Sequence, residues 1–305
     1  MQRLTVEHKT IYRYKRPVKF GEHRLMLRPR ESHDLRLLSS RLLIQPDANV
    51  RWMHDVFSNS VAIADILQPS DELCIENTFI LDRYPSEDPT FCIDPYAQKL
   101  PFSYSAREVP DLGRNIERHH PDPDRHVIEW TRERLSLAGD MDTEDFLIGI
   151  TRDIRNAFRY EVRQEPGVQT PVETLERGAG SCRDYALFMM EAVRSVGLAA
   201  RFVSGYLYDS ALDGVESNIA GAGSTHAWVQ VYLPGAGWVE FDPTNGSHGG
   251  NNLIPVAVAR DPSQAMPVSG TYDGDPNDFL EMEVVVEVHS MDIPAPMLVK
   301  PGNPG

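Results

Sequence analysis

The sequence has few cysteines, only three in 305 residues, and no CxxC pair. Cys74, Cys92 and Cys182 are too few and too widely spaced for a disulfide framework or a structural zinc site. The adjacent histidines His119 and His120 lie in a proline-rich stretch that has no matching carboxylate spacing. We therefore predict no metal and no other cofactor.

Basic residues and long apolar runs are also scarce. Thirty Lys and Arg residues face 45 Asp and Glu residues, and the resulting formal charge of -15 repels nucleic acid and anionic membrane surfaces. The first residues, "MQRLTVEHKTIYRYKRPV", contain no signal-peptide core, and no later run is long enough to span a bilayer. We expect no nucleic-acid partner, no membrane partner and a cytoplasmic location; the sequence does not indicate an oligomeric state.

The chain reads as an α+β protein that begins with a sheet. Residues 1–85 run in short alternating pieces such as "LTVEHKTIYRY", which predict an N-terminal antiparallel β-sandwich. Residues 86–123 are rich in proline and are interpreted as a linker.

The second predicted unit, residues 124–290, places helices before a sheet. Apolar residues spaced at three and four predict helices in "DRHVIEWTRERLSL" and "DTEDFLIGITRDIRNAFRY", followed by a loop over 161–180 and a helix from Ser181. Strands follow in "RFVSGYLY", "THAWVQVYL" and "GWVEFD". After an irregular stretch over 245–278, one last strand, "FLEMEVVVEVH", closes this unit, and residues 291–305 are expected to form a loose tail.

One cysteine has a distinctive setting at a predicted helix start. In "GAGSCRDYA", Ser181 can cap the helix together with Asp184, which puts Cys182 in the first turn. Unpaired backbone N–H groups and the positive end of the helix dipole favour the thiolate there, and the Cys182 N–H can help to bind an oxyanion. The alternative is a small buried residue that packs a helix end.

A predicted hairpin, "THAWVQVYLPGAGWVEFDPTN", carries a histidine and an aspartate. If Leu233 and Gly237 close a three-residue loop, Asp242 lies opposite Trp228 and diagonal to His226, about 7–8 Å away along the backbone. A four-residue loop would put them on opposite faces. An imidazole held by a carboxylate is a suitable base for a cysteine nucleophile, although each residue alone is ordinary in a strand or turn.

The chain order Cys182, His226, Asp242, with "GAGSCRDYA" and "STHAWVQVYLPGAGWVEFDPTNG", resembles the transglutaminase-like superfamily. The segments "EHKTIYRYKRPV", "NAFRYEVRQEPGVQTPVETLERGAGSCRDYA" and "PVSGTYDG" are similar to its bacterial branch, which has an N-terminal sheet domain and includes proposed cysteine proteases. The resemblance implies a papain-like, transglutaminase-like core in which helices pack on an antiparallel sheet.

The resemblance also implies a thiol acyltransferase, or a cysteine protease or amidase. Cys182 would attack a carboxamide or peptide carbonyl, His226 would move the proton, and Asp242 would orient His226. The acyl-thioester would then pass to an amine or to water, from a protein, peptide or small amide substrate. Superfamily members use a side chain upstream of the cysteine as a second oxyanion donor, a role open to Tyr160 or Gln169.

Two further alternatives remain open in the sequence. Trp228 either walls the substrate cleft or simply packs in the interior. The whole chain could also be a catalytically silent module that binds peptides or serves as a scaffold on the same fold. The joint presence of Cys182, His226 and Asp242 favours the enzyme.

Overall fold

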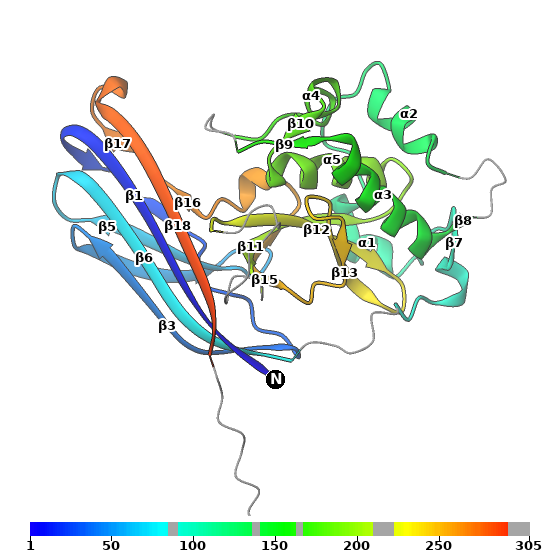
Figure 1. The fold of residues 1–305 in the computed structure, drawn as a ribbon, viewed down its shortest axis with the longest axis horizontal. Helices are drawn as coiled ribbons and strands as arrows, with labels where there is room; N and C mark the ends of the chain where they lie inside the picture. Colours follow the sequence, from blue (N-terminus) through cyan, green and yellow to red (C-terminus); the bar gives the residue numbers. More distant parts are fainter. Residues whose placement is uncertain (85–90, 136–140, 163–166, 210–222, 292–305) are drawn as a thin grey trace, which may run out of the picture.

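A computed structural model describes residues 1–84, 91–135, 141–162, 167–209 and 223–291. The long strands near the N-terminus form one side of the molecule (Figure 1). A separate sheet, the central sheet, lies in the middle, and helices cover its far face (Figure 1). No helix in the described ranges is both long and apolar enough to cross a bilayer.

The N-terminal part is an antiparallel sandwich, as predicted. Its first sheet contains β1 (Gln2–Phe20), β3 (Leu35–Gln45), β6 (Ser70–Arg83), β17 (Tyr272–Asp273) and β18 (Phe279–Met291). Its second sheet contains β2 (His23–Leu25), β4 (Ala48–His54), β5 (Ser60–Ile66) and β16 (Val268–Ser269). Alternating residues of both sheets, among them Val18, Leu25, Ala64 and Leu73, are buried in one shared core.

The last strand in the described part of the chain, β18, belongs to this sandwich, which corrects the prediction that it closes the second unit. β18 pairs with β1 from Arg3 opposite Met291 to Tyr14 opposite Phe279. Val286 and Val288 are buried with the apolar face of β1. A period of two identifies a strand but not its partner, so the return of 268–291 to the N-terminal sheets depends on tertiary packing.

The central sheet has the order β14–β13–β12–β11–β15 and is antiparallel throughout. Its strands are β11 (Ala200–Leu207), β12 (His226–Leu233), β13 (Gly237–Asp242), β14 (Ser247–His248) and β15 (Leu253–Ala259). β15 lies in the stretch that was expected to be irregular. Nearly all of its residues are buried, so it reads as an apolar run rather than as an alternation.

Helices cover one face of this sheet (Figure 1). These helices are α2 (His126–Arg132), α3 (Thr143–Ala157), α4 (Pro171–Arg177) and α5 (Cys182–Arg194). The short helix α1 (Glu108–Leu112) buries Leu112 in a separate cluster with Tyr104 and Ala199. The same part of the chain contains the short strands β7 (Lys99–Leu100), β8 (Met141–Asp142), β9 (Arg159–Tyr160) and β10 (Ala179–Gly180). The predicted helices correspond to α2, α3 and α5. The predicted loop over 161–180 instead contains α4. The capping box of Thr170 and Glu173 and the proline at the first helical position are signals for a helix start, but the helix has only two turns.

The described part of the predicted linker, residues 91–123, packs on the core. Ile93, Ala97 and Leu100 are buried in the same cluster as α5. The hydroxyl of Tyr104 donates to the carbonyl of Tyr232 at 2.8 Å. Prolines limit the length of regular elements here, but they do not prevent apolar side chains from being buried.

The sandwich docks against the opposite face of the central sheet. Leu4 and Phe79 share a buried cluster with Tyr206 and Ile254 of the central sheet. The fully buried amide of Asn59 pairs with both backbone groups of Val258, at 2.7 and 2.9 Å. These contacts join the two parts into one packed unit.

Candidate active site

Cys182 is the first residue of α5, as the sequence predicts. The Asp184 carboxylate accepts hydrogen bonds from the backbone N–H of Ser181 at 2.7 Å and from its hydroxyl at 2.8 Å. It also accepts from the backbone N–H of Gln169 at 2.7 Å. This fully buried carboxylate therefore ties the helix start to the preceding segment and sets the position of Cys182. Cys182 itself is 7 % exposed.

The hairpin has the three-residue loop on which the predicted geometry depends. Leu233 pairs with Gly237, and this register continues to Val229 opposite Phe241. Gly235 adopts a φ of +88°, and a Cβ there would lie 2.5 Å from the carbonyl oxygen of Cys92. The turn therefore needs glycine both for its conformation and for its close packing.

The predicted histidine and aspartate meet in the interior. The Nε2 atom of His226 lies 2.8 Å from Oδ2 of Asp242, and both side chains are fully buried. Asp242 also accepts hydrogen bonds from the backbone N–H of Thr244 at 2.9 Å and from the side-chain amide of Asn245 at 2.7 Å. These contacts hold the carboxylate in a single orientation toward the imidazole.

The electrostatics of this pair favour a charged imidazole. Burial alone would lower the pKa of His226, but the charge and hydrogen bond of Asp242, followed by Cys182, raise it to about 10. Burial opposes ionisation of Asp242 as well, yet His226, Asn245 and the Thr244 N–H keep its pKa below the ordinary value. The other ring nitrogen, Nδ1, is buried and has no hydrogen-bond partner among the described residues. It is the ring nitrogen that Asp242 does not engage.

The structure separates the two oxyanion candidates. Burial raises the pKa of Tyr160, and charges on Cys182 and Asp242 raise it further, which places a neutral phenol beside the cysteine. Gln169 instead donates its side-chain N–H to Asp184 at 3.2 Å and to the carbonyl of Ala179 at 3.3 Å. Tyr160 therefore lies beside Cys182, while Gln169 contacts the start of α5.

Trp228 is fully buried among Val203, Leu207, Leu253 and Val258, so it does not wall an open cleft. Its ring stacks on His226 with the centroids 6.0 Å apart and an interplanar angle of 26°. The indole backs the imidazole from the interior of the protein and restricts its movement.

Asn245 and Arg183 make contacts near the candidate site that the sequence indicated only weakly. Asp-Pro-Thr-Asn after β13 is a common turn pattern, and here the turn brings Asn245 back onto Asp242. Arg183 follows the cysteine but points away to another segment, where it donates to the carbonyl of Pro262 at 2.7 Å. Only the packed structure identifies that contact.

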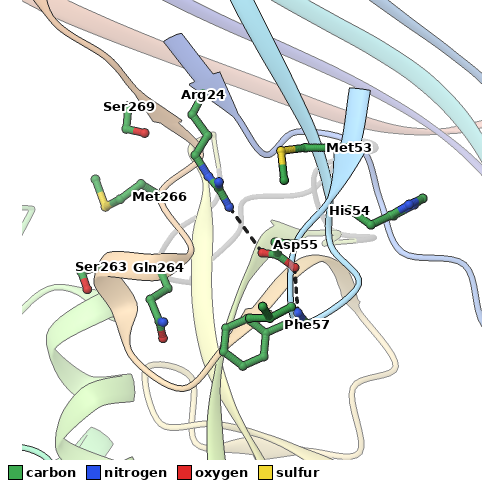
Figure 2. Close-up of a pocket in the computed structure, with 10 residues that line it drawn as sticks. Arg24, Met53, His54, Asp55, Phe57, Ser263, Gln264, Met266 and Ser269 are labelled. Carbon is green, nitrogen blue, oxygen red and sulfur yellow. Dashed lines mark hydrogen bonds and ion pairs between the residues drawn. The ribbon is translucent and has the colours of Figure 1, made fainter. Parts of the chain in front are cut away.

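The segment that Arg183 contacts borders a cavity of about 490 Å³ beside the sandwich (Figure 2). Arg24 reaches Asp55 at 3.5 Å, and Asp55 accepts from the backbone N–H of Phe57 at 2.9 Å. Met53 and Met266 add apolar surface to this cavity. Cys182, His226 and Asp242 are not among its lining residues.

Sequence comparison agrees with this architecture. Residues 4–82 match the bacterial transglutaminase-like N-terminal region, and residues 133–243 match the transglutaminase-like superfamily. The chain therefore belongs to the transglutaminase-like superfamily, in the bacterial branch that carries this N-terminal region.

Three known proteins are similar to this chain. An uncharacterized protein of Mycobacterium leprae is 26% identical and covers 94% of this chain and 99% of its own. The crystal structure of a proposed cysteine protease from Cytophaga hutchinsonii superimposes with a TM-score of 0.68 at 16% identity, over 96% of this chain and 92% of its own. A protein-glutamine gamma-glutamyltransferase of Pseudomonas aeruginosa is 38% identical over 72 residues, which are 22% of this chain and 10% of that protein.

Proposed function

We propose that the protein is a cysteine-dependent acyl-transfer enzyme that acts on a carboxamide or peptide carbonyl. The observation that carries this proposal is the convergence of three elements: the start of α5 with Cys182, the start of β12 with His226, and the end of β13 with Asp242. His226 is hydrogen-bonded to Asp242 and also interacts with Cys182. A nucleophile, a base and a residue that orients the base are thus present together.

In the proposed reaction, the thiol proton of Cys182 passes first to Nδ1 of His226, and the sulfur anion of the resulting ion pair then attacks the carbonyl carbon. The negative charge that develops on the carbonyl oxygen is stabilised by the Cys182 backbone N–H and by the Tyr160 hydroxyl. As the intermediate collapses, the C–N bond breaks and the leaving amine takes the proton from His226. This leaves an acyl-thioester on Cys182.

In the second half of the reaction, an amine or water attacks the thioester and gives a proton to His226. The new bond forms at the carbonyl carbon while the C–S bond breaks, and the proton returns to the cysteine. Asp242 stays ionised throughout and stabilises the imidazolium, as its lowered pKa requires.

The acceptor divides this class into transfer and hydrolysis. The similarity to a protein-glutamine gamma-glutamyltransferase supports transfer from a glutamine side chain to an amine, and it extends over 22% of this chain. A glutamine-containing peptide and a fluorescent primary amine are therefore the first substrates to use. Amine incorporation measured beside ammonia release separates transfer from hydrolysis.

The direct test is the rate of iodoacetamide labelling across pH, with mass spectrometry to locate the label. Cys92 is exposed, Cys74 is buried, and all three cysteines are free, so each reports on a different setting. At pH 6 we expect Cys182 to react about tenfold faster than Cys92, because Cys182 lies in the first turn of α5 and interacts with His226, a setting that favours attack by the sulfur.

The matched variants are His226→Ala, which should remove this advantage, and Cys92→Ser, which should leave the labelling of Cys182 unchanged. If Cys182 reacts no faster than Cys92, or reacts only after unfolding, the proposal fails. The same fold would then serve as a binding module without catalysis.

A further inference from the structure

A second cavity, of about 620 Å³, lies between the sandwich and the central sheet. The sandwich contributes Arg30 and Arg83 to its lining, and the central sheet contributes Arg201, Gln230 and Glu240. Cys182, His226 and Asp242 do not line it. The cavity is therefore separate from the candidate active site.

Arg83, the last residue of β6, is buried with 3 % of its surface exposed. Its Nη2 atom donates to the carbonyl of Gly250. Its Nε and Nη1 atoms have no hydrogen-bond partner among the residues that the structure describes. Burial lowers the pKa of Arg83 despite the attraction of Glu240 and Asp34. A buried guanidinium with two free donors is costly unless an acceptor is bound to it.

The central sheet contributes a second guanidinium, that of Arg201, to the lining of the same cavity. Arg201, Gln230 and Glu240 form a row across β11, β12 and β13. Arg201 donates through Nε to Gln230 at 2.7 Å, and Gln230 donates to Glu240 at 3.0 Å. The guanidinium also lies over the ring of Trp238, 4.1 Å from its centroid. Gln230 and Trp238 thus fix the orientation of Arg201.

Three guanidiniums, those of Arg30, Arg83 and Arg201, and three carboxyls line the cavity. Burial, and then the like charge of Arg30, lower the pKa of Arg201 to about 9, against the attraction of Glu240. Burial also raises the pKa of Glu240 to about 7, against the hydrogen bond of Gln230 and the charge of Arg83. Of the other two lining carboxylates, Asp34 accepts from the Ser32 hydroxyl, and the exposed Glu31 accepts from a backbone N–H at 3.1 Å.

We propose that this cavity binds a small oxyanion, either a carboxylate or a phosphate, between Arg83 of the sandwich and Arg201 of the central sheet. The fork of N–H donors on a guanidinium matches the oxygen spacing of both groups. A bound anion satisfies Arg83 and relieves the repulsion between Arg30 and Arg201. It also links the sandwich to the strands that carry His226 and Asp242.

The test is isothermal titration calorimetry, together with thermal unfolding, on the full chain at fixed ionic strength balanced with sodium chloride. Inorganic phosphate and succinate are the two probes. We expect saturable binding of at least one probe and a rise in Tm that follows its occupancy. Arg83→Gln should weaken binding by about tenfold or more, because it removes the free donors and the charge.

Two controls separate this site from general charge effects and from catalysis. Arg41→Gln makes the same change at an exposed position on β3, outside the cavity, and should bind the probe as the wild type does. Cys182→Ala should also bind normally, since the proposal does not depend on catalysis. Arg201→Lys keeps the charge but loses the fork of N–H donors. The variant should therefore fold normally and bind the probe more weakly than the wild type.

Each outcome is decisive. Binding of succinate alone identifies a carboxylate ligand, binding of phosphate alone identifies a phosphate, and either result supports the site. No saturable binding of either probe would overturn it. Wild-type affinity in Arg83→Gln would also overturn the proposal. If Arg83→Gln does not fold, wild-type affinity in Arg201→Lys would overturn it instead.

Discussion

The Nε2 atom of His226 lies 2.8 Å from Oδ2 of Asp242, although the two residues are on different strands and 16 positions apart. The three-residue loop closed by Leu233 and Gly237 sets this approach, because it puts both side chains on one face. Burial then strengthens the interaction by removing the screening of water.

The first prediction concerns stability and pH. The pKa of His226 is raised from about 6.5 in the unfolded chain to about 10 in the folded protein. The folded state therefore holds a proton that the unfolded state has released. The stabilisation is complete below about pH 6.5 and is lost progressively as the pH rises toward 10.

Asp242→Asn removes the charge that raises this pKa, so the variant should lose less stability than the wild type between pH 6.5 and 10. Urea unfolding at several pH values in this range measures the difference. Asp273→Asn, which changes an exposed residue of β17, is the control. Its free energy of unfolding should fall with pH as steeply as that of the wild type. Equal slopes in the wild type and Asp242→Asn would contradict the charged pair.

The second prediction concerns the start of α5. Asp184→Ala removes an acceptor shared by Ser181 and Gln169 and leaves buried N–H groups unpaired. We expect a loss of about 2–4 kcal/mol in the free energy of unfolding. Asp145→Ala, at an exposed position in the first turn of α3, should cost about 0.5 kcal/mol or less. Chemical denaturation of both variants checks this, and similar losses would contradict the anchoring role.

The third prediction separates Tyr160 from Gln169. Tyr160→Phe should lower kcat by about 10–1000-fold and change stability little, because it removes only a donor to the developing oxyanion. Gln169→Ala should instead lower the free energy of unfolding by about 1–2 kcal/mol, because Asp184 and Ala179 lose a partner. Steady-state kinetics and denaturation on both variants measure the contrast. If kcat falls in Gln169→Ala but not in Tyr160→Phe, Gln169 rather than Tyr160 is the oxyanion donor.

The fourth prediction concerns the packing behind the histidine. Gly205 pairs with His226 in the sheet, and a Cβ there would lie 2.1 Å from the carbonyl oxygen of Ile254 and 2.7 Å from the Trp228 ring. Gly205→Ala should therefore destabilise the protein by about 2 kcal/mol or more.

Gly149 is the matched control, because it lies within α3 and a Cβ there meets nothing within 4 Å. Gly149→Ala should stabilise the protein by about 0.5–1 kcal/mol. Thermal unfolding of both variants tests the pair. An unchanged Tm in Gly205→Ala would show that the strands can separate at no cost.

Local signals in the sequence were enough to predict several parts of the candidate site. The capping pattern of Ser181 and Asp184 located the start of α5, and alternation in the hairpin put His226 and Asp242 on strands. Whether these two side chains lie on the same face of the sheet still depended on the length of the hairpin loop, which the sequence left open. Each of these features depends on neighbours within a few residues or within one hairpin.

Other features were decided by tertiary structure alone. Nothing in the pattern of β18 indicates that it pairs with β1, and nothing near Arg83 indicates that it lines a cavity together with Arg201. The choice between Tyr160 and Gln169 likewise depends on which side chain approaches Cys182 in the packed core. The sequence by itself determines helix starts, strand periodicity and turns, because these depend on short-range backbone and side-chain chemistry. Strand partners, buried charges and the sides of a cavity depend on contacts between distant segments, which are established only when the core packs.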